Sequence, residues 1–183
     1  MATAPSTLPD LSAVPDAELL RLDHQVCFSL HAASRAFGGY YRRALKDLGL
    51  TYAQYLVMLV LWEQGPQSVK AIGERLHLDS GTLSPLLKRL EGAGLVRRER
   101  SREDERSVVI DLTDEGAELR ERALSVPRGV LAATGLSLEE VLGLQEILGR
   151  LTGALGEAVD ANDSESCRIS SPVKGIVRAN GDS

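Results

Sequence analysis

Apolar residues recur at helical spacing near the start of the chain. Steps of three and four residues along one stripe predict an amphipathic helix that runs to the Gly38-Gly39 pair: Leu22, Val26, Leu30, Ala33 and Phe37. A second helical piece is expected over Tyr40–Leu48, because Gly49 interrupts the pattern there.

The middle of the chain predicts three helices joined by short turns. The signature Thr51-x-x-Gln54 is a capping box, and it opens an apolar helix over Tyr52–Gln64. A short helix follows over Ser68–Leu76, with the serine as its cap. A tight turn at His77-Leu78 then leads into a helix over residues 79–91. The predicted order is therefore helix, short turn, helix.

The last of these helices has two distinct sides. Asp79 or Ser80 caps it, and it reaches Glu91. One apolar stripe is formed by Leu83, Leu86, Leu87 and Leu90. The other side carries Thr82, Pro85, Lys88 and Arg89. That polar side is available to a partner, and an α-helix of this kind fits the major groove of DNA.

Two extended stretches follow, Leu95–Arg100 and Ser107–Leu112, and the charged segment Ser101–Arg106 between them is turn-like. This pattern predicts a β-hairpin. Residues 97–106 hold five arginines against four acidic residues, so the hairpin is dense in charge without being strongly basic. A wing of this kind can place one arginine in the narrow minor groove, where the potential is most negative.

Helices are also predicted after the hairpin. Thr113 caps a long helix that Pro127 interrupts, and Ser137-x-x-Glu140 caps a final helix that ends at about Ala161. The expected fold class is mainly α with a small β-hairpin, arranged as a winged helix-turn-helix. Helices from both ends of the chain flank this central unit.

Composition and length fit one domain with terminal extensions. The 183 residues are 43% hydrophobic, which is enough for a core, and only 4% aromatic, which favours packed helices. We expect a disordered arm over residues 1–15 and a disordered tail over 162–183, since both are rich in small and polar residues. The domain itself should cover 16–161, with its DNA-binding part at about 52–112.

Net charge and hydropathy limit the function classes. The formal charge of −5 argues against non-specific binding of polyanions, so a nucleic-acid surface must be local. Residues Met1–Pro15 lack the pattern of a secretory signal. The longest apolar run, Tyr55–Trp62, is far shorter than the ~20 residues that span a bilayer. We therefore expect a cytoplasmic protein without membrane association.

Two cysteines, Cys27 and Cys167, lie far apart in the sequence. Structural disulfides are rare in a reducing compartment, so chemical roles are more plausible for these thiols. No Cys-x-x-Cys pair is present, which excludes a zinc ribbon and a thioredoxin-type motif. We expect no cofactor and no metal ion.

Helical geometry places Cys27 at the border of the first apolar stripe, about 100° from its centre at ~100° per residue. Asp23, His31 and Ser34 share that border, and His24 lies a little further round the helix. The thiol should therefore have polar neighbours and partial access to solvent. A small apolar filler of the core is the alternative for such a cysteine.

Three segments resemble the MarR family, and specifically its organic hydroperoxide resistance regulators: YAQYLVMLVLWE at 52–63, LDSGTLSPLLKRLE at 78–91 and DERSVVIDL at 104–112. The resemblance covers roughly residues 22–123. It implies an obligate homodimer made by intertwined terminal helices, which represses transcription by binding double-stranded, pseudo-palindromic operator DNA. It does not imply an enzyme.

The same resemblance implies which residues meet DNA. Side chains of the helix over residues 79–91 would face the operator: Ser80, Thr82, Ser84, Pro85, Lys88 and Arg89. Arg98 would touch the DNA backbone, Arg106 would enter the minor groove, and Asp104 would orient that arginine.

The resemblance also implies a redox switch at Cys27, which lies in the segment HQVCFSL at residues 24–30. Phenol groups of the partner subunit hold the thiolate in this family, and by position these are Tyr41 and Tyr52. Hydrogen bonds to a thiolate favour the charged form, which attacks peroxide oxygen to give a sulfenic acid. Oxidation by organic hydroperoxides would then release the DNA. Apolar surroundings that include Phe28 and Phe37 would favour alkyl hydroperoxides over hydrogen peroxide.

This chain departs from the family pattern at two places. A further tyrosine expected one turn after the cysteine is His31 here. The stretch that holds a resolving cysteine in two-cysteine members, Arg128–Thr134, has none. Either Cys167 or a low-molecular-weight thiol would have to trap the sulfenic acid.

Three other functions remain open from the sequence. His24, Cys27 and His31, with Asp23 nearby, could present metal ligands from one side of a helix. A small phenolic ligand could release the repressor without any cysteine chemistry. A thiol peroxidase is disfavoured, because a β-sheet scaffold, a glycine-rich loop and a resolving thiol in a folded position are missing from the pattern.

Overall fold

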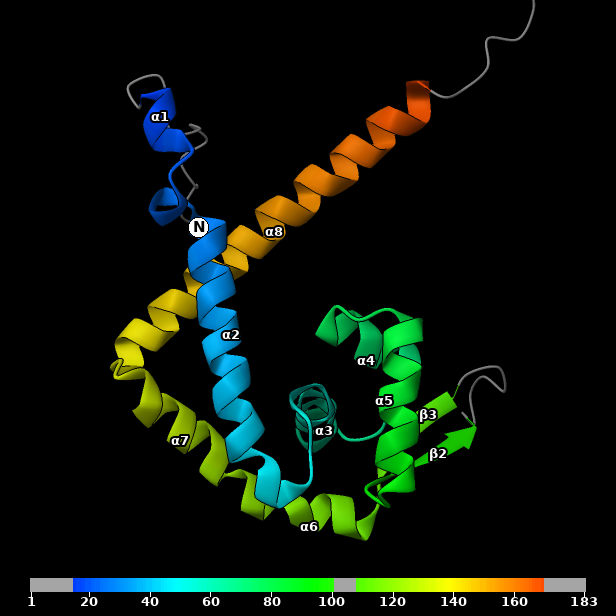
Figure 1. Cartoon of the computed structure of the whole chain (residues 1–183). Helices are drawn as coiled ribbons and strands as arrows, with labels where there is room; N and C mark the ends of the chain where they lie inside the picture. Colours follow the sequence, from blue (N-terminus) through cyan, green and yellow to red (C-terminus); the bar gives the residue numbers. More distant parts are fainter. Residues whose placement is uncertain (1–14, 101–107, 170–183) are drawn as a thin grey trace, which may run out of the picture. The chain divides into compact units, whose positions relative to one another are not determined.

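The computed structural model describes residues 15–100 and 108–169 (Figure 1). The chain divides into two compact units between Ala133 and Thr134. The first unit contains the helices α1 (Asp16–Leu19), η1 (Leu22–His24), α2 (Val26–Ala44), η2 (Lys46–Leu48), α3 (Tyr52–Gln64), α4 (Val69–Leu76), α5 (Ser80–Gly92), α6 (Asp114–Ala123) and α7 (Ser125–Thr134) and the strands β1 (Gln67–Ser68), β2 (Val96–Arg100) and β3 (Val108–Leu112). The helix α8 (Leu138–Ile169) belongs to the second unit.

The predicted caps start the helices where the sequence places them. Thr51 and Gln54 form a complete capping box at α3, whose bounds are those predicted. Ser68 accepts a hydrogen bond from the backbone N–H of Ala71 at 3.1 Å and caps α4. Asp79, rather than Ser80, caps α5. The central helices are therefore set by local sequence signals.

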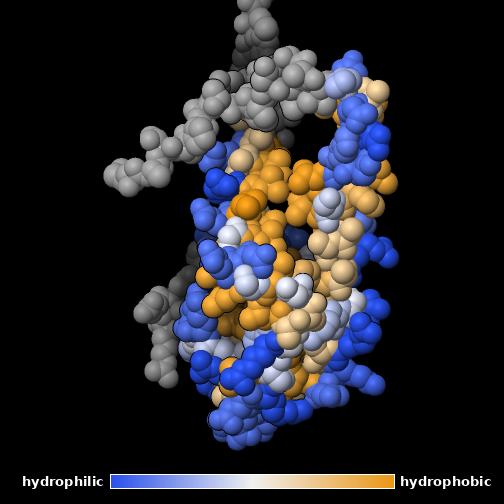
Figure 2. Space-filling view, turned by 90° about the vertical axis from the view of Figure 1, so that its left-hand side faces the viewer, coloured by the Kyte–Doolittle hydropathy of each residue, from blue (hydrophilic) through white to orange (hydrophobic). Residues whose placement is uncertain are grey.

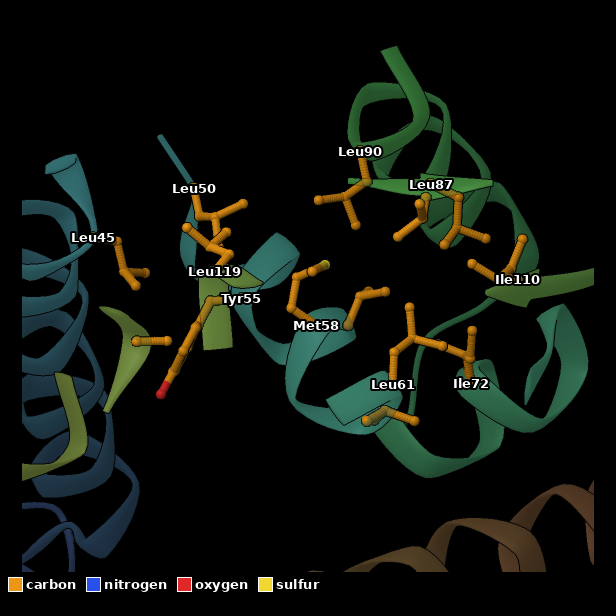
Figure 3. Close-up of a cluster of buried hydrophobic side chains, with 14 of the residues drawn as sticks. Leu45, Leu50, Tyr55, Met58, Leu61, Ile72, Leu87, Leu90, Ile110 and Leu119 are labelled. Atoms are coloured by element: carbon orange, nitrogen blue, oxygen red, sulfur yellow. The ribbon is translucent and has the colours of Figure 1, made fainter. Parts of the chain in front are cut away.

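The core of the first unit lies between α3, α4, α5 and the sheet (Figure 3), and it extends to Leu119 of α6 and Val126 of α7. Met58 and Leu61 of α3 are fully buried together with Ile72 of α4 and Ile110 of β3. The predicted stripe of α5 also faces this core: Leu83, Leu87 and Leu90 are buried, and Leu86 is half-buried. This packing fixes α5 with its polar side toward solvent. Figure 3 also shows Tyr55 at the edge of the cluster, with its hydroxyl directed away from Met58.

The sheet has three strands in the order β1-β3-β2, not the two strands of the predicted hairpin. β2 and β3 form the antiparallel hairpin, with Val96 opposite Leu112 and Arg97 opposite Asp111. The additional strand β1 pairs antiparallel with β3 through Gln67 and Ser68. Strand β1 is too short for a period-two pattern, which is why the sequence does not reveal it.

Helix α2 differs from the prediction in its length and its exposure. It runs continuously through Gly38-Gly39, because an interior glycine keeps its backbone N–H and weakens a helix by only about 1 kcal/mol. The stripe predicted to be buried is not: Val26 is 66% exposed and Phe37 is 41% exposed. No residue of α2 is buried within the described part of this chain.

The helices after the sheet also depart from the prediction in detail. The break between α6 and α7 falls at Leu124, before Pro127. Pro127 lies in the first turn of α7, where its missing N–H would have had no partner within the helix. α8 runs to Ile169, beyond the predicted end at about Ala161. Across the described ranges, none of the helices has the length and hydropathy needed to cross a bilayer.

Candidate nucleic-acid interface and thiol site

One side of α5 is a polar surface. All six side chains of α5 that were predicted to face DNA are exposed: Ser80, Thr82, Ser84, Pro85, Lys88 and Arg89. The Asp79 carboxylate organises the start of this surface, because it accepts hydrogen bonds from the backbone N–H of Thr82 at 2.9 Å and from its hydroxyl at 2.8 Å. These donors hold the pKa of Asp79 below its usual value.

Strand β2 contributes Arg98 to the same surface. Ser80, Gly81, Ser84, Pro85, Lys88 and Arg98 line an open hollow of about 590 Å³. The guanidinium of Arg98 pairs with the Glu91 carboxylate, with Nε 3.0 Å from Oε2. Its Nη2 lies 3.5 Å from the backbone carbonyl oxygen of Ser84. The fold thus brings this arginine to the polar side of α5, and its predicted contact with the DNA backbone stays a prediction.

Gly81 is a member of this hollow that the sequence reasoning missed. It has no side chain, and Pro85 one turn later has no N–H to donate to the Gly81 carbonyl. The Gly81 carbonyl therefore lacks the usual helical hydrogen bond from position 85, and no side chain at position 81 covers it. A Gly-x-x-x-Pro spacing at the start of a polar helix face was the available signal.

Arg97 lies next to Arg98 in the sequence but has a structural role. Its guanidinium donates to the Glu99 carboxylate at 2.8 Å and to the Leu112 carbonyl oxygen at 2.7 Å, and it also pairs with Asp111. The hydrogen bond to Glu99, and then the charges of its acidic neighbours, raise the pKa of Arg97. Arg97 therefore ties β2 to β3.

The residues at the predicted tip of the wing are not among those that the structure describes. Asp104 and Arg106 lie outside the described residues. Their predicted roles, orienting an arginine and entering the minor groove, remain predictions.

Cys27 lies in the first turn of α2 and is exposed. Two of the polar residues predicted near it are engaged elsewhere: Asp23 pairs with Arg21 at 2.8 Å, and Nδ1 of His24 lies 3.1 Å from the carbonyl oxygen of Glu18. In the described part of the chain, no group of three His, Cys, Asp or Glu side chains could hold a metal ion.

The two predicted tyrosines come together. Tyr41 of α2 and Tyr52 of α3 have ring centroids 4.5 Å apart, and Tyr55 lies 6.0 Å from Tyr41. Tyr52 is 46% exposed, whereas Tyr41 is half-buried. Burial, followed by the neighbouring phenols, raises the pKa of Tyr41 to about 12. Tyr41 therefore stays protonated at neutral pH and can donate a hydrogen bond.

The tyrosine pair and the thiol lie at opposite ends of α2. At ~1.5 Å of rise per residue, the backbone of Cys27 is about 21 Å from that of Tyr41 along the same helix. No rotamer of either side chain spans that distance. One chain therefore carries both halves of the predicted thiol site but cannot join them by itself.

Several known proteins are similar to this chain in sequence or in fold. The family model described as "Transcriptional regulator SarA/Rot" matches residues 40–122. The chain is 46% identical over 136 residues to the organic hydroperoxide resistance transcriptional regulator of Bacillus subtilis (strain 168), which covers 74% of this chain and 92% of that protein.

Solved structures agree with this result. Reduced AbfR bound to DNA has 40% sequence identity and a TM-score of 0.66, with 78% of this chain and 97% of that chain covered. AbfR is a protein of Staphylococcus epidermidis. Its disulfide form matches with 41% identity and a TM-score of 0.55, over 74% of this chain and 96% of that one.

The matches extend over nearly the whole length of these relatives. The residues matched by the family model, 40–122, contain the elements from α3 to β3. The relatives are DNA-binding regulators rather than enzymes. The chain is thus a transcriptional regulator that belongs to the MarR family of winged-helix proteins, in the group that contains the organic hydroperoxide resistance regulators.

Proposed function

We propose that this protein is a homodimeric repressor that binds its operator when Cys27 is reduced and releases it when organic hydroperoxides oxidise that thiol. The observation that carries the proposal is the separation of an exposed Cys27 from the Tyr41–Tyr52 pair by the length of α2. A second copy of α2 in antiparallel orientation would bring the thiol of one protomer to the phenols of the other.

The surface of α2 favours this dimer. Its apolar side chains Val26, Phe28 and Phe37 are exposed, although such residues are usually buried. Figure 2 views the side of the molecule that carries α2 and α7, and hydrophobic residues gather there in a band with hydrophilic residues on both sides. Several apolar residues of α8 are exposed as well, among them Leu142, Ile147 and Leu155. A partner protomer would bury these side chains.

The chemistry at the joined site follows from its groups. The Cys27 thiolate attacks one peroxide oxygen, so that an S–O bond forms while the O–O bond breaks. The other oxygen leaves with the electron pair of that bond and takes up a proton to become an alcohol, and the sulfur becomes a sulfenic acid. Condensation with a second thiol then gives a disulfide and water. Cys167 or a low-molecular-weight thiol would supply that second thiol.

Protonated phenols suit the first step. The Tyr41 hydroxyl, whose pKa is raised by burial to about 12, is protonated at neutral pH, so it can donate a hydrogen bond to the thiolate and afterwards to the leaving oxygen. Tyr52 is accessible to a partner because its ring is 46% exposed. His31, which replaces an expected tyrosine, is also exposed on α2 and can act as a further donor.

For the operator, we propose that α5 enters the major groove with its six exposed polar-side residues toward the bases and phosphates. Arg98 would contact the backbone at the edge of the same hollow. Arg106 would enter the minor groove, oriented by Asp104. Two recognition helices in a dimer would read half-sites about 34 Å apart, so a small rotation between protomers would break register.

The decisive experiment is a DNA mobility shift with and without cumene hydroperoxide. The probe is a duplex selected by the reduced protein from a random-sequence pool. We expect the native protein to lose the shift after peroxide and regain it after a thiol reductant, whereas Cys27→Ser keeps it throughout. Cys167→Ser is the matched control for the second cysteine. Equal release of native and Cys27→Ser protein by peroxide would rule out the proposed trigger.

A ligand-released repressor is the second candidate. Tyr55, Leu59 and Trp62 of α3 line a mainly apolar pocket of about 270 Å³ with Leu124, Pro127 and neighbouring residues, and Arg120 lies in its lining. An aromatic carboxylate matches this mixture of apolar walls and one cation. Release of the Cys27→Ser protein by benzoate or salicylate, without any peroxide, would favour this function over the redox switch.

A further inference from the structure

We propose that Trp62 is a positioning residue that couples the tyrosine pair of the thiol site to the base of the wing. This inference rests on the proposed redox function. The proposed link between Cys27 and the polar surface of α5 includes one hydrogen bond, from the Trp62 indole N–H to the Gly116 carbonyl oxygen.

The first half of the link is a run of aromatic rings. Tyr41 packs against Tyr52 at 4.5 Å and against Tyr55 at 6.0 Å between ring centroids. Tyr55 in turn meets Trp62 edge-on at 6.2 Å, further along α3. Tyr55 is 3% exposed, so its ring has little room to move independently of its neighbours. If oxidation of Cys27 displaces Tyr41 or Tyr52, the movement is therefore transmitted to Tyr55 and then to Trp62.

The second half is a hydrogen bond between distant segments. The indole N–H of Trp62 donates to the carbonyl oxygen of Gly116 in α6 at 2.8 Å. It is a side-chain contact between α3 and the segment that follows the wing. The indole has a single donor and cannot accept a replacement bond, so the contact is either made or lost.

The backbone of Gly116 packs directly against Leu95, the residue that precedes β2 at the base of the wing. A Cβ on Gly116 would lie 2.0 Å from the carbonyl oxygen of Leu95, the residue before β2. The backbone N–H of Thr113 donates to that same oxygen at 3.2 Å, and the Thr113 hydroxyl donates to the Gly94 carbonyl at 2.6 Å. The start of α6 and the start of β2 therefore move together.

β2 carries Arg98, which lies on the polar side of α5. A shift of Gly116 passes through Leu95 to β2, and so to the position of Arg98 in the hollow beside Ser84. Each step from Tyr41 to Arg98 is a direct contact or a short stretch of one backbone. The arrangement gives the sensing and recognition regions a continuous path of contacts. The inferred coupling requires that the Trp62–Gly116 hydrogen bond differ between the reduced and the oxidised protein.

The test replaces the donor while keeping an aromatic ring. Trp62→Phe and a variant with 3-benzothienylalanine at position 62 both lack the N–H, and the second keeps the bicyclic shape. Leu59→Met, on the same helix and in the same pocket, is the control for altered packing. The dissociation constant for the selected duplex is measured by fluorescence anisotropy with reduced and with peroxide-treated protein, and thiol loss at Cys27 is followed separately.

We expect both variants to keep the reduced-state affinity within about threefold and the rate of Cys27 oxidation unchanged. The ratio of oxidised to reduced dissociation constants should fall by about tenfold, which lies within ordinary allosteric coupling. A purely structural role for Trp62 would instead weaken the reduced protein and leave this ratio intact, and that result would overturn the inference.

A second readout needs no variant at position 62. Trp62 is the only tryptophan of the chain, so its emission reports this contact directly. Peroxide should shift that emission in the native protein and not in Cys27→Ser. Native protein that releases DNA without any change in emission contradicts the link. Native protein that does not release DNA at all contradicts the redox function instead, so the two failures are distinguishable.

Discussion

The backbones of Gly73 and Leu78 are in direct contact at the turn between α4 and α5. The N–H of Leu78 donates to the carbonyl oxygen of Gly73 at 2.9 Å, and a Cβ on Gly73 would lie 2.8 Å from the carbonyl oxygen of Leu78. The N–H of His77 donates to Glu74, which completes a Schellman motif. The turn of the helix-turn-helix is thus closed by backbone against backbone.

The first prediction concerns Gly73→Ala. The added methyl group would meet a backbone oxygen that cannot rotate away, so the turn must shift, and we expect a loss of about 1–3 kcal/mol in the free energy of unfolding. Urea denaturation measures it. Gly92→Ala, at the end of α5, is the matched control: a Cβ there would have no heavy atom within 4 Å, so the change should be neutral or stabilising. A Gly73→Ala protein as stable as the native one would refute the role of this contact.

His77 offers a stabilising change. Its φ of 53° lies in the left-handed region, and it is the only non-glycine residue of the described chain with a positive φ. Glycine removes the steric cost of the side chain there, although it also makes the unfolded chain more flexible. We expect His77→Gly to raise the free energy of unfolding by about 0.5–1 kcal/mol. His77→Val should lower it, and the opposite order in thermal melts would contradict this reading of the turn.

Asp79 gives a pH-dependent prediction. Hydrogen bonds from the hydroxyl and the N–H of Thr82 lower its pKa in the folded state. A lowered folded pKa contributes stability that is present above the unfolded value of about 3.8 and is lost as the pH falls through the folded value. Asp79→Asn keeps a capping oxygen without the charge.

The difference in unfolding free energy between native and Asp79→Asn protein should therefore be largest near pH 7 and disappear in strong acid. Asp79→Ala, which loses the cap itself, should be less stable than Asp79→Asn at every pH. If the difference in unfolding free energy between native and Asp79→Asn protein stays constant from pH 7 to pH 3, the carboxylate charge has no part in the cap.

Loss of the positive charge should affect DNA binding at Lys88 and folding stability at Arg97. Lys88 is exposed on the polar side of α5, so Lys88→Gln should weaken operator binding and flatten the plot of log affinity against log salt by about 0.9 per lost phosphate contact. Arg97 is held by Glu99 and Asp111, so Arg97→Gln should lower stability and leave the salt slope unchanged. Anisotropy titrations between 50 and 300 mM KCl would separate the two effects.

Local signals predicted the middle of the fold because each was complete within a few residues. The box of Thr51 and Gln54, and the single caps Ser68, Asp79 and Thr113, satisfy orphan N–H groups irrespective of the tertiary structure. The stripe of α5 was recognisable for the same reason. In contrast, Gly38-Gly39 was misread as a stop, since glycine weakens a helix without removing a hydrogen bond.

The remaining features depend on contacts between distant segments. Arg97 and Arg98 are equivalent in any count of charges, and only the register that sets Arg97 opposite Asp111 separates the structural arginine from the one beside α5. The apolar stripe predicted for the first helix is exposed within this chain. Periodicity identifies apolar positions on one side of a helix, but it cannot show what covers them.

The ion pair between Arg98 and Glu91 has a consequence for how the regulator searches the genome. If Arg98 contacts the DNA backbone as proposed, an approaching phosphate must compete with the Glu91 carboxylate, whose Oε2 lies 3.0 Å from Nε of Arg98. This competition would lower the affinity for random and specific sequences alike, and the overall charge of −5 acts in the same direction. Stable binding would then require a sequence that also makes favourable contacts with the rest of α5, so the protein would leave random DNA quickly.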